Sequence, residues 1–146
     1  MKKKRKLHVL LCGLGGGIIG FFANHLTEWY GCVLFGLGDA VYELYIREYL
    51  ISKNICKVND LQNESLKYVS AKSQSEHLER LINSNFLTEE EIDIVKRGRN
   101  MSSHRSKSVD IVTYKRSTGL ECLIGSLRTS KKDDRIREIM EFIVGD

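Results

Sequence analysis

The chain has 146 residues, of which 42% are hydrophobic and 29% charged, a composition typical of one globular domain with a core of its own. It contains no proline, so no helix loses a backbone donor to one, and a mostly helical chain is favoured. The four cysteines (Cys12, Cys32, Cys56 and Cys122) stand far apart, which excludes a C-x-x-C zinc site and a disulfide framework; we interpret them as small buried residues in a reducing compartment.

The net charge of +4 is distributed unevenly along the chain. Residues 1–6 contain five basic residues, and residues 96–116 contain seven basic residues and one acidic residue, whereas residues 7–95 are mildly acidic. A basic block in an otherwise acidic chain is consistent with a binding surface for a polyanion. A solvated charged surface is the commoner explanation for any such run, so the charge pattern alone leaves both open.

Residues 1–30 differ from the rest, because MKKKRK is followed by an apolar run of about 20 residues. Three interpretations compete: a secretory signal ending near Ala23, a weak membrane span, and a G-x-G-x-x-G nucleotide loop at Gly15, Gly17 and Gly20. No second strand–helix unit follows the glycines, which speaks against the third. For the fold we prefer an N-terminal extension of unclear role over residues 1–30, either packed or disordered.

From residue 31 onward the pattern predicts helices separated by short gaps. The expected helices run from 31 to about 53, from Asn59 through Ala71, from an S-x-x-E cap at Ser73, from a T-x-x-E cap at Thr88 to a stop at Gly98, from about Ser117 to Leu127, and over DDRIREIMEFIV. Residues 98–112 are polar and basic and are expected to form a loop. The predicted fold class is therefore all-α, a compact helical bundle.

The first of these helices carries the most informative carboxylate. Its surface is apolar in most directions, which predicts a buried helix, and the main exception is the stripe Asp39, Glu43 and Arg47 at i, i+4 and i+8. An i,i+4 ion pair accounts for Glu43 and Arg47. Asp39 is left without a partner beside Gly38, and a carboxylate in a buried helix requires a cation.

Glu121 is ambiguous on its own. Thr118 and Glu121 fit T-x-x-E, so Glu121 is either part of a capping box or a metal ligand, and the residues alone do not decide between these two roles.

A family resemblance covers roughly residues 31–146. GDAVYELYIREYL resembles the signature helix of ribonuclease III in the form found in Mini-ribonucleases III, and KVNDL, YVSAKSQSEHL, FLTEEEIDIVKRGRN and D-x-x-TYKRST-x-x-E-x-LIG follow in the same order. The resemblance implies an all-α ribonuclease III-type endonuclease domain over residues 31–146, with no double-stranded-RNA-binding domain attached.

The resemblance also implies an activity and a site. It implies a homodimeric, Mg²⁺-dependent endoribonuclease that cleaves double-stranded RNA stems to 5′-phosphate and 3′-hydroxyl ends, in maturation of the large-subunit (23S) ribosomal RNA precursor. Asp39 matches the catalytic aspartate of G-D-A and Glu121 the glutamate of S-T-x-x-E, and both would bind the magnesium that activates water.

The sequence departs from the family pattern at several positions. Thr118 and Phe35 replace acidic residues of the larger ribonucleases III, which leaves the number of metal ions open. Gly36, Arg116 and Ser126 replace tyrosines that are common in Mini-ribonucleases III. The thin set of acidic ligands keeps an alternative in play: a non-catalytic RNA-binding or ribosome-assembly protein with the same fold.

The basic block then becomes a candidate RNA surface that neutralises phosphates without reading bases. The predicted RNA-binding residues are Lys72, Arg97, Arg99, Asn100, Arg105, Lys107, Tyr114 and Lys115, with Lys96, His104 and Arg116 beside them. Partners expected from the resemblance are a second copy of the chain, precursor ribosomal RNA, and a ribosomal protein or pre-ribosomal particle, with no membrane. The expected compartment is the cytoplasm, with an organelle stroma or matrix, or an N-terminal membrane tether, as alternatives.

Overall fold

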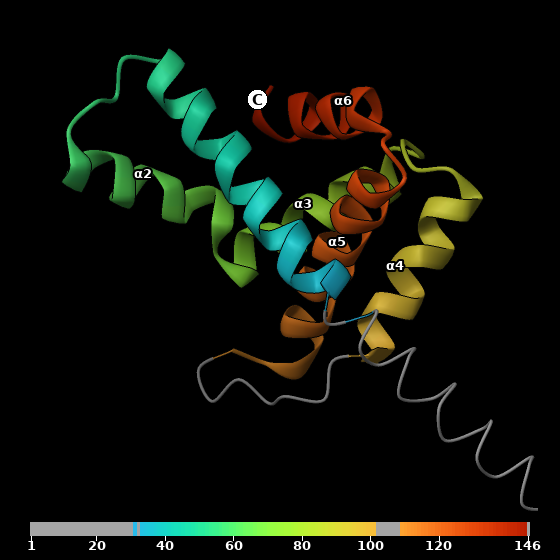
Figure 1. Ribbon diagram of the computed structural model, residues 1–146. Helices are drawn as coiled ribbons and strands as arrows, with labels where there is room; N and C mark the ends of the chain where they lie inside the picture. Colours follow the sequence, from blue (N-terminus) through green and yellow to red (C-terminus); the bar gives the residue numbers. More distant parts are fainter. Residues whose placement is uncertain (1–30, 32, 102–108, 146) are drawn as a thin grey trace, which may run out of the picture. The chain divides into compact units, whose positions relative to one another are not determined.

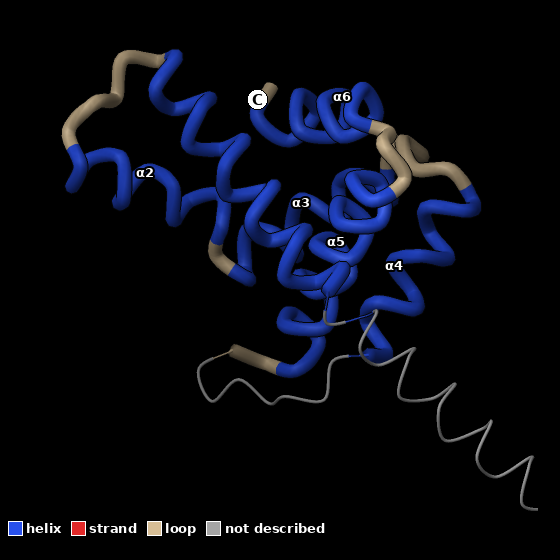
Figure 2. The backbone as a smooth tube through the Cα atoms, in the orientation of Figure 1, coloured by secondary structure: helices blue, strands red, loops and turns tan. Residues whose placement is uncertain are grey.

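The computed structural model describes residues 31, 33–101 and 109–145 of the chain. Residues from Val33 onward belong to one compact unit, Val33–Asp146. The expectations for residues 1–30 and for the loop at 102–108 therefore lie outside the described residues. Throughout the described ranges the backbone forms helices joined by short turns, with no strand (Figure 2). The predicted all-α fold is confirmed.

The helices follow one another closely along the chain (Figure 1). They are a first helix over residues 33–52, α2 (Val58–Val69), α3 (Ala71–Asn83), α4 (Glu89–Met101), α5 (Ile111–Thr129) and α6 (Asp133–Val144). The last helix matches its prediction. None of the helices in these ranges is long and apolar enough to cross a membrane.

The two predicted helix boundaries next to the basic loop were wrong. α4 continues through Gly98 to Met101, so Gly98 does not end it. α5 begins at Ile111, six residues before Ser117, because the Asp110 side chain accepts hydrogen bonds from the backbone N–H of Val112 (2.9 Å) and Thr113 (3.1 Å). The predicted loop over 98–112 is correspondingly shorter at both ends.

Of the three predicted helix caps, one is confirmed and two were wrong. Thr88 and Glu91 form the expected capping box: Thr88 N–H donates to Glu91 Oε2 (2.9 Å) and Glu91 N–H to Thr88 Oγ1 (3.3 Å). The cap of α3 is Ser70, not Ser73, because the Ser70 hydroxyl accepts from Ser73 N–H. α2 starts one residue before Asn59 and has no side-chain cap. It ends at Val69, so the predicted end at Ala71 was wrong, and Ala71 is the first residue of α3.

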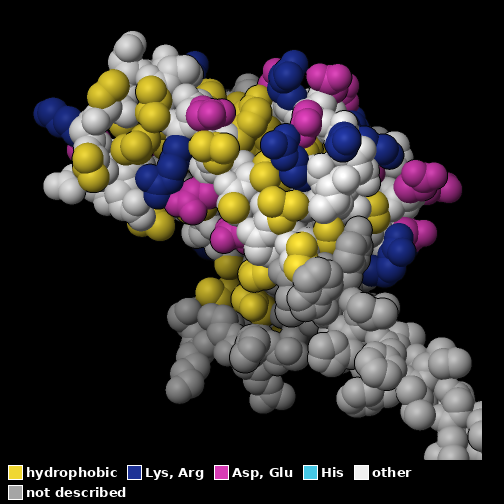
Figure 3. Space-filling model, viewed as in Figure 1, with side chains coloured by type: hydrophobic (Ala, Val, Ile, Leu, Met, Phe, Trp, Pro, Cys, Tyr) yellow, Lys and Arg dark blue, Asp and Glu magenta, His cyan; other side chains and the backbone are white. Residues whose placement is uncertain are grey.

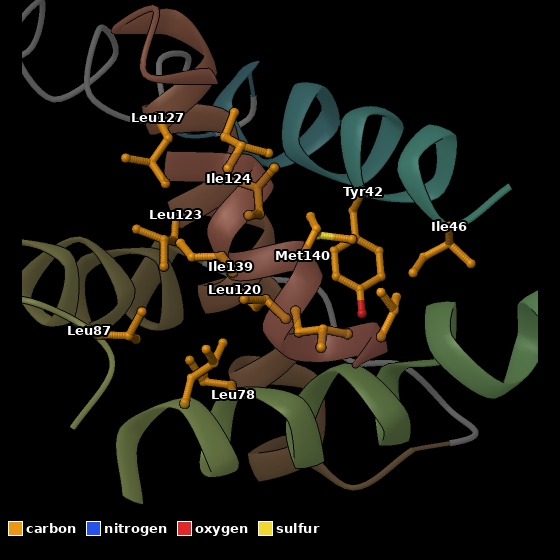
Figure 4. Packing of buried hydrophobic residues seen from close by; sticks show 14 of the residues in the cluster. Tyr42, Ile46, Leu78, Leu87, Leu120, Leu123, Ile124, Leu127, Ile139 and Met140 are labelled. Carbon is orange, nitrogen blue, oxygen red and sulfur yellow. The ribbon is translucent and has the colours of Figure 1, made fainter. Parts of the chain in front are cut away.

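α5 is the central helix of the described unit. From Ser117 to Leu127 all of its residues except Ser126 are buried, and α3, α4 and α6 pack around it. Its Leu120, Leu123 and Ile124 meet Leu78 of α3 and Ile139 and Met140 of α6 in one hydrophobic core (Figure 4). The helix that is buried on nearly every side is therefore α5.

The helix over residues 33–52 is buried on one face only, so the prediction that it is buried throughout was wrong. Its buried stripe is Gly38, Tyr42, Ile46 and Leu50, one residue every four. Leu44 on the opposite side is 57% exposed. The apolar residues of this helix exceed what one packed face can cover.

The described residues include two cysteines, Cys56 and Cys122. Cys122 is buried in α5, as predicted, whereas Cys56 lies exposed in the turn before α2, so the expectation of burial was wrong there.

Candidate active site

Two glycines bring the backbones of the first helix and α5 into contact. A Cβ atom on Gly38 would stand 1.7 Å from the carbonyl oxygen of Glu121, and one on Gly125 would stand 2.0 Å from the carbonyl oxygen of Leu34. No side chain fits at either position. The close crossing fixes Asp39, the residue after Gly38, beside Glu121.

Asp39 and Glu121 face each other across this crossing. Asp39 lies at the edge of the packed face and is exposed, whereas Glu121 is 6% exposed in the middle of α5. Their carboxyl groups are close enough to share a hydrogen bond. The structure therefore brings together the two residues that the sequence singled out as metal ligands.

Burial and a neighbouring carboxylate raise the pKa of each carboxyl: Asp39 is that neighbour for Glu121, and Glu43 is that neighbour for Asp39. For Glu121 burial comes first and the charge of Asp39 second, and together they raise its pKa to about 8, against a smaller opposing contribution from the Gln74 amide. For Asp39 partial burial is again the larger cause, with Glu43 adding to it and the hydrogen bond to Glu121 opposing it. The pair favours one shared proton until a cation replaces that proton.

Two buried polar atoms at this site have no hydrogen-bond partner: Oε2 of Glu121 itself and Nε2 of the neighbouring Gln74. Gln74 is 1% exposed on α3, and its amide lies against the Glu121 carboxylate. Buried polar groups are normally satisfied, so an unsatisfied carboxylate oxygen next to an exposed aspartate marks a place for a ligand. Oxygen donors of this kind suit a hard divalent cation such as Mg²⁺.

The acidic set is small. The described residues contain no group of three or more His, Cys, Asp or Glu side chains placed to hold one ion. Glu43 does not join the site, because Arg47 binds it at 2.6 Å, as the i,i+4 spacing predicted. With two carboxylates, the remaining positions around a magnesium ion belong to water and phosphate oxygens.

The capping-box alternative for Glu121 was wrong. Thr118 lies inside α5, and its hydroxyl donates to the Tyr114 carbonyl (3.0 Å) rather than accepting from Glu121 N–H. Glu121 is thus a buried carboxylate in a helix interior, where no orphan backbone donor needs it.

The predicted RNA-binding residues of α4 and α5 lie on two helices in close contact. A Cβ on Gly98 would stand 2.6 Å from Cβ of Cys122, and one on Gly119 would stand 3.0 Å from Cγ of Arg99. The stem of Arg99 therefore lies against α5, two residues before Glu121. Arg97 and Asn100 are exposed on the same last turns of α4.

The other predicted RNA contacts are dispersed. Lys72 is exposed on the first turn of α3, and Tyr114 and Lys115 are half-buried at the start of α5. Lys96 pairs with Asp93 (3.1 Å) and Arg116 with Glu79 (3.2 Å), so both cations have acidic partners within the protein. The predictions for His104, Arg105 and Lys107 fall outside the described residues.

Comparison with known proteins agrees with this geometry. The Ribonuclease III domain matches residues 33–132, more than half of the chain. The chain belongs to the ribonuclease III family. It is 41% identical to Mini-ribonuclease 3 of Staphylococcus aureus over 122 residues, covering 83% of this chain and 91% of the relative. It is 46% identical to Mini-ribonuclease 3 of Brevibacillus brevis over 110 residues, covering 75% and 81%.

A solved structure supports the same assignment. The crystal structure of a protein from Fusobacterium nucleatum superposes with a TM-score of 0.70 at 33% identity, over 79% of this chain and 91% of that one. The predicted family resemblance, the ribonuclease III fold and the enzyme class, an endoribonuclease, are confirmed.

Sequence reasoning missed Gln74 and the partner glycine Gly125. A signal for Gln74 was present, since it stands four and seven residues before Leu78 and Leu81 on the apolar face of α3. A polar residue at a core position of an amphipathic helix indicates a specific partner. Nothing local marks Gly125, because its role depends on which helix crosses it.

Proposed function

We propose that this ribonuclease III-family protein cleaves double-stranded RNA with magnesium held by Asp39 and Glu121. The observation that supports this most directly is the pairing of an exposed aspartate with a buried glutamate that has an unsatisfied oxygen, at a crossing fixed by glycines. Two ionised carboxylates held close together repel each other, and the free energy of that arrangement is high unless a cation lies between them.

Asp39 and Glu121 contribute differently to such a site. The exposed carboxylate of Asp39 is reachable by a phosphodiester, whereas Glu121 is anchored within α5 and fixes the inner side of the site. The ion, when bound, supplies charge stabilisation at the phosphate and lowers the pKa of water near it. The packed crossing keeps the two carboxylates at a constant separation, so no ordering is needed when the substrate binds.

The substrate class is supported by the charge around the site. Arg97, Arg99 and Asn100 at the end of α4 and Lys115 at the start of α5 offer cationic and polar contacts to phosphates. Contacts to phosphates do not read base edges, so recognition should depend on the A-form shape of the duplex. Stems of a large-subunit ribosomal RNA precursor are the substrate that we propose within this class, reached with help from a ribosomal protein or pre-ribosomal particle.

We propose that the protein acts as a homodimer. The first helix exposes Val33 (38%), Leu44 (57%) and Ile51 (51%), and Figure 3 shows hydrophobic side chains among the charged ones on one face of the molecule. Exposed apolar residues of this kind are available for contact with a second copy. Two copies also provide one carboxylate pair for each strand of a duplex.

The experiment uses wild type, Asp39→Asn and Glu121→Gln on a long uniform double-stranded RNA, with and without magnesium. We expect wild type to cut only with metal, and each variant to lose at least about 100-fold in rate, because each removes a ligand to the ion. Asp60→Asn, on the exposed first turn of α2, is the matched control and should keep the wild-type rate.

The alternative is a non-catalytic RNA-binding or ribosome-assembly protein, motivated by the small acidic set. Binding without cutting under any divalent ion, on long duplexes and on precursor ribosomal RNA with ribosomal proteins, would establish that alternative. Magnesium-dependent cutting that disappears in Asp39→Asn would reject it.

A further inference from the structure

α3 carries a buried amide where its packing pattern calls for an apolar side chain. Gln74 shares the inward face of α3 with Leu78 and Leu81, and these three residues are 1%, 1% and 0% exposed. A methionine or leucine has nearly the same volume and would need no hydrogen bond. The amide is therefore kept at a cost to folding, which indicates a use beyond packing.

His77, another buried polar residue of α3, has a hydrogen-bond partner within the protein, in contrast to the Gln74 amide nitrogen. Nδ1 of His77 lies 2.9 Å from the hydroxyl of Tyr42 on the first helix. Gln74 Nε2 has no partner, and the atom beside it in the same condition is Glu121 Oε2. The Gln74 amide nitrogen is a donor with two N–H groups, and the Glu121 carboxylate oxygen is an acceptor, so the two groups are complementary.

We propose that Gln74 is a positioning residue of the active site: when a cation binds between Asp39 and Glu121, the Gln74 amide donates to the Glu121 carboxylate oxygen that the cation leaves free and so fixes the orientation of that carboxylate. This inference rests on the proposed function. It assigns no contact between Gln74 and RNA, and the amide acts only through Glu121.

A neutral donor suits this position better than a charged one. Lysine or arginine beside Glu121 would pair with the carboxylate and compete with the cation, as Arg47 does with Glu43 at 2.6 Å. An amide fixes the orientation of the carboxylate and leaves its charge for the ion. Hydrogen bonds from outside the ligand set commonly orient metal-binding carboxylates in this way.

The test uses Gln74→Met and Gln74→Leu, two apolar variants of similar volume, so that the result does not depend on one variant folding. Mg²⁺ and Mn²⁺ binding to the metal-free protein is measured by calorimetry, and thermal unfolding is measured with and without metal. We expect both variants to bind the ions about 10- to 100-fold more weakly than wild type. Without metal their melting temperature should equal or exceed that of wild type, because an unsatisfied buried amide has been removed.

Kinetics give a second readout. At saturating metal and RNA the variants should lose kcat, while KM for RNA stays at the wild-type value, because Gln74 does not touch the duplex. Ser65→Ala is the matched control: it also removes a fully buried polar group, whose hydroxyl donates to the Gln62 carbonyl (2.9 Å) on α2. It should leave metal affinity and kcat unchanged.

Asp39→Asn, run in parallel, separates the two levels of the proposal. If wild type neither binds these ions nor cuts RNA, the proposed function fails and the role of Gln74 falls with it. If wild type and Asp39→Asn behave as expected but both Gln74 variants bind metal like wild type, only the inference about Gln74 is wrong. A lower melting temperature without metal, at unchanged metal affinity, would show that the amide serves the fold alone.

Discussion

The carboxyl group of Glu121 is buried in the interior of α5. It stands in an α5 segment of buried small and apolar residues, and its nearest charged group is Asp39. Because its pKa is raised from 4.5 to about 8, the folded metal-free protein keeps a proton on Glu121 between these pH values, whereas the unfolded chain releases it.

The first prediction concerns the stability of the metal-free protein against pH. The unfolded carboxyl titrates near 4.5 and the folded one near 8, so between these values the native state binds more protons than the unfolded state. Wild-type stability should then fall as pH rises through this window and level off above it. Glu121→Gln carries no titrating group, so its advantage over wild type should be small at pH 5 and reach several kcal/mol near pH 9.

Urea unfolding of both proteins at several pH values in a chelating buffer measures this difference. Glu64→Gln, a change on the surface of α2 where Lys67 pairs with Glu64 at 2.7 Å, is the control and should show no growing advantage. A constant difference between Glu121→Gln and wild type from pH 5 to pH 9 would contradict the raised pKa.

The second prediction, at the scale of elements, concerns the crossing of the first helix and α5. Gly38→Ala places a methyl group where the Glu121 carbonyl stands, 1.7 Å away, so the helices must separate. Overpacking of this kind costs about 1–3 kcal/mol or more. We expect Gly38→Ala to lose stability and also RNA cleavage, because Asp39 moves away from Glu121.

Gly36→Ala is the matched control two residues earlier in the same helix. A Cβ there meets nothing within 4 Å, and alanine favours a helix over glycine by about 0.5–1 kcal/mol. Denaturant midpoints and cleavage rates of the two variants are compared with wild type. Equal effects of the two substitutions would mean that the close crossing does not hold the site together.

Interactions between residues close together in the chain could be predicted from the sequence. Helix existence followed from local patterns: the Thr88–Glu91 capping box and the i,i+4 pairing of Glu43 with Arg47 are interactions between near neighbours, and both were predicted. Asp39 was predicted to bind a cation because its carboxylate has no partner on a largely apolar helix.

The errors came from features that local patterns do not carry. The first helix was expected to be buried on all sides, but among the described residues it is buried on one face. The helix that its neighbours surround is α5, whose two glycines and Glu121 interrupt its apolar pattern. The start of α5 was missed because Asp110 caps it within a stretch that looked like loop. The choice between cap and ligand for Glu121 needed the tertiary contact with Asp39 or the family resemblance.

At the scale of the whole molecule, the cations of α6 and those near the end of α4 differ in their partners, and both arginines of α6 pair with acidic residues. Arg137 of α6 lies 3.7 Å from Asp134, and Arg135 pairs with Glu91 (2.8 Å) and Glu138 (2.6 Å). Arg97, by contrast, has a hydrogen bond from Nε to the neutral backbone carbonyl of Asp93 (3.3 Å), one turn before the end of α4 beside the site. The charge of Arg97 thus remains available to phosphates.

This distribution predicts that the salt dependence of RNA binding changes with the place of the lost charge, not with its number. Arg97→Ala and Arg137→Ala each remove one exposed arginine, but only the first lies on the predicted RNA surface. With an Asp39→Asn background to prevent cutting, log Kd for duplex RNA is measured against log salt. We expect Arg97→Ala to weaken binding and to lower the slope by about 1, since one fewer counterion is released, while Arg137→Ala leaves both unchanged. If both variants weaken binding equally, the attraction comes from net charge alone, and the end of α4 is not where the duplex lies.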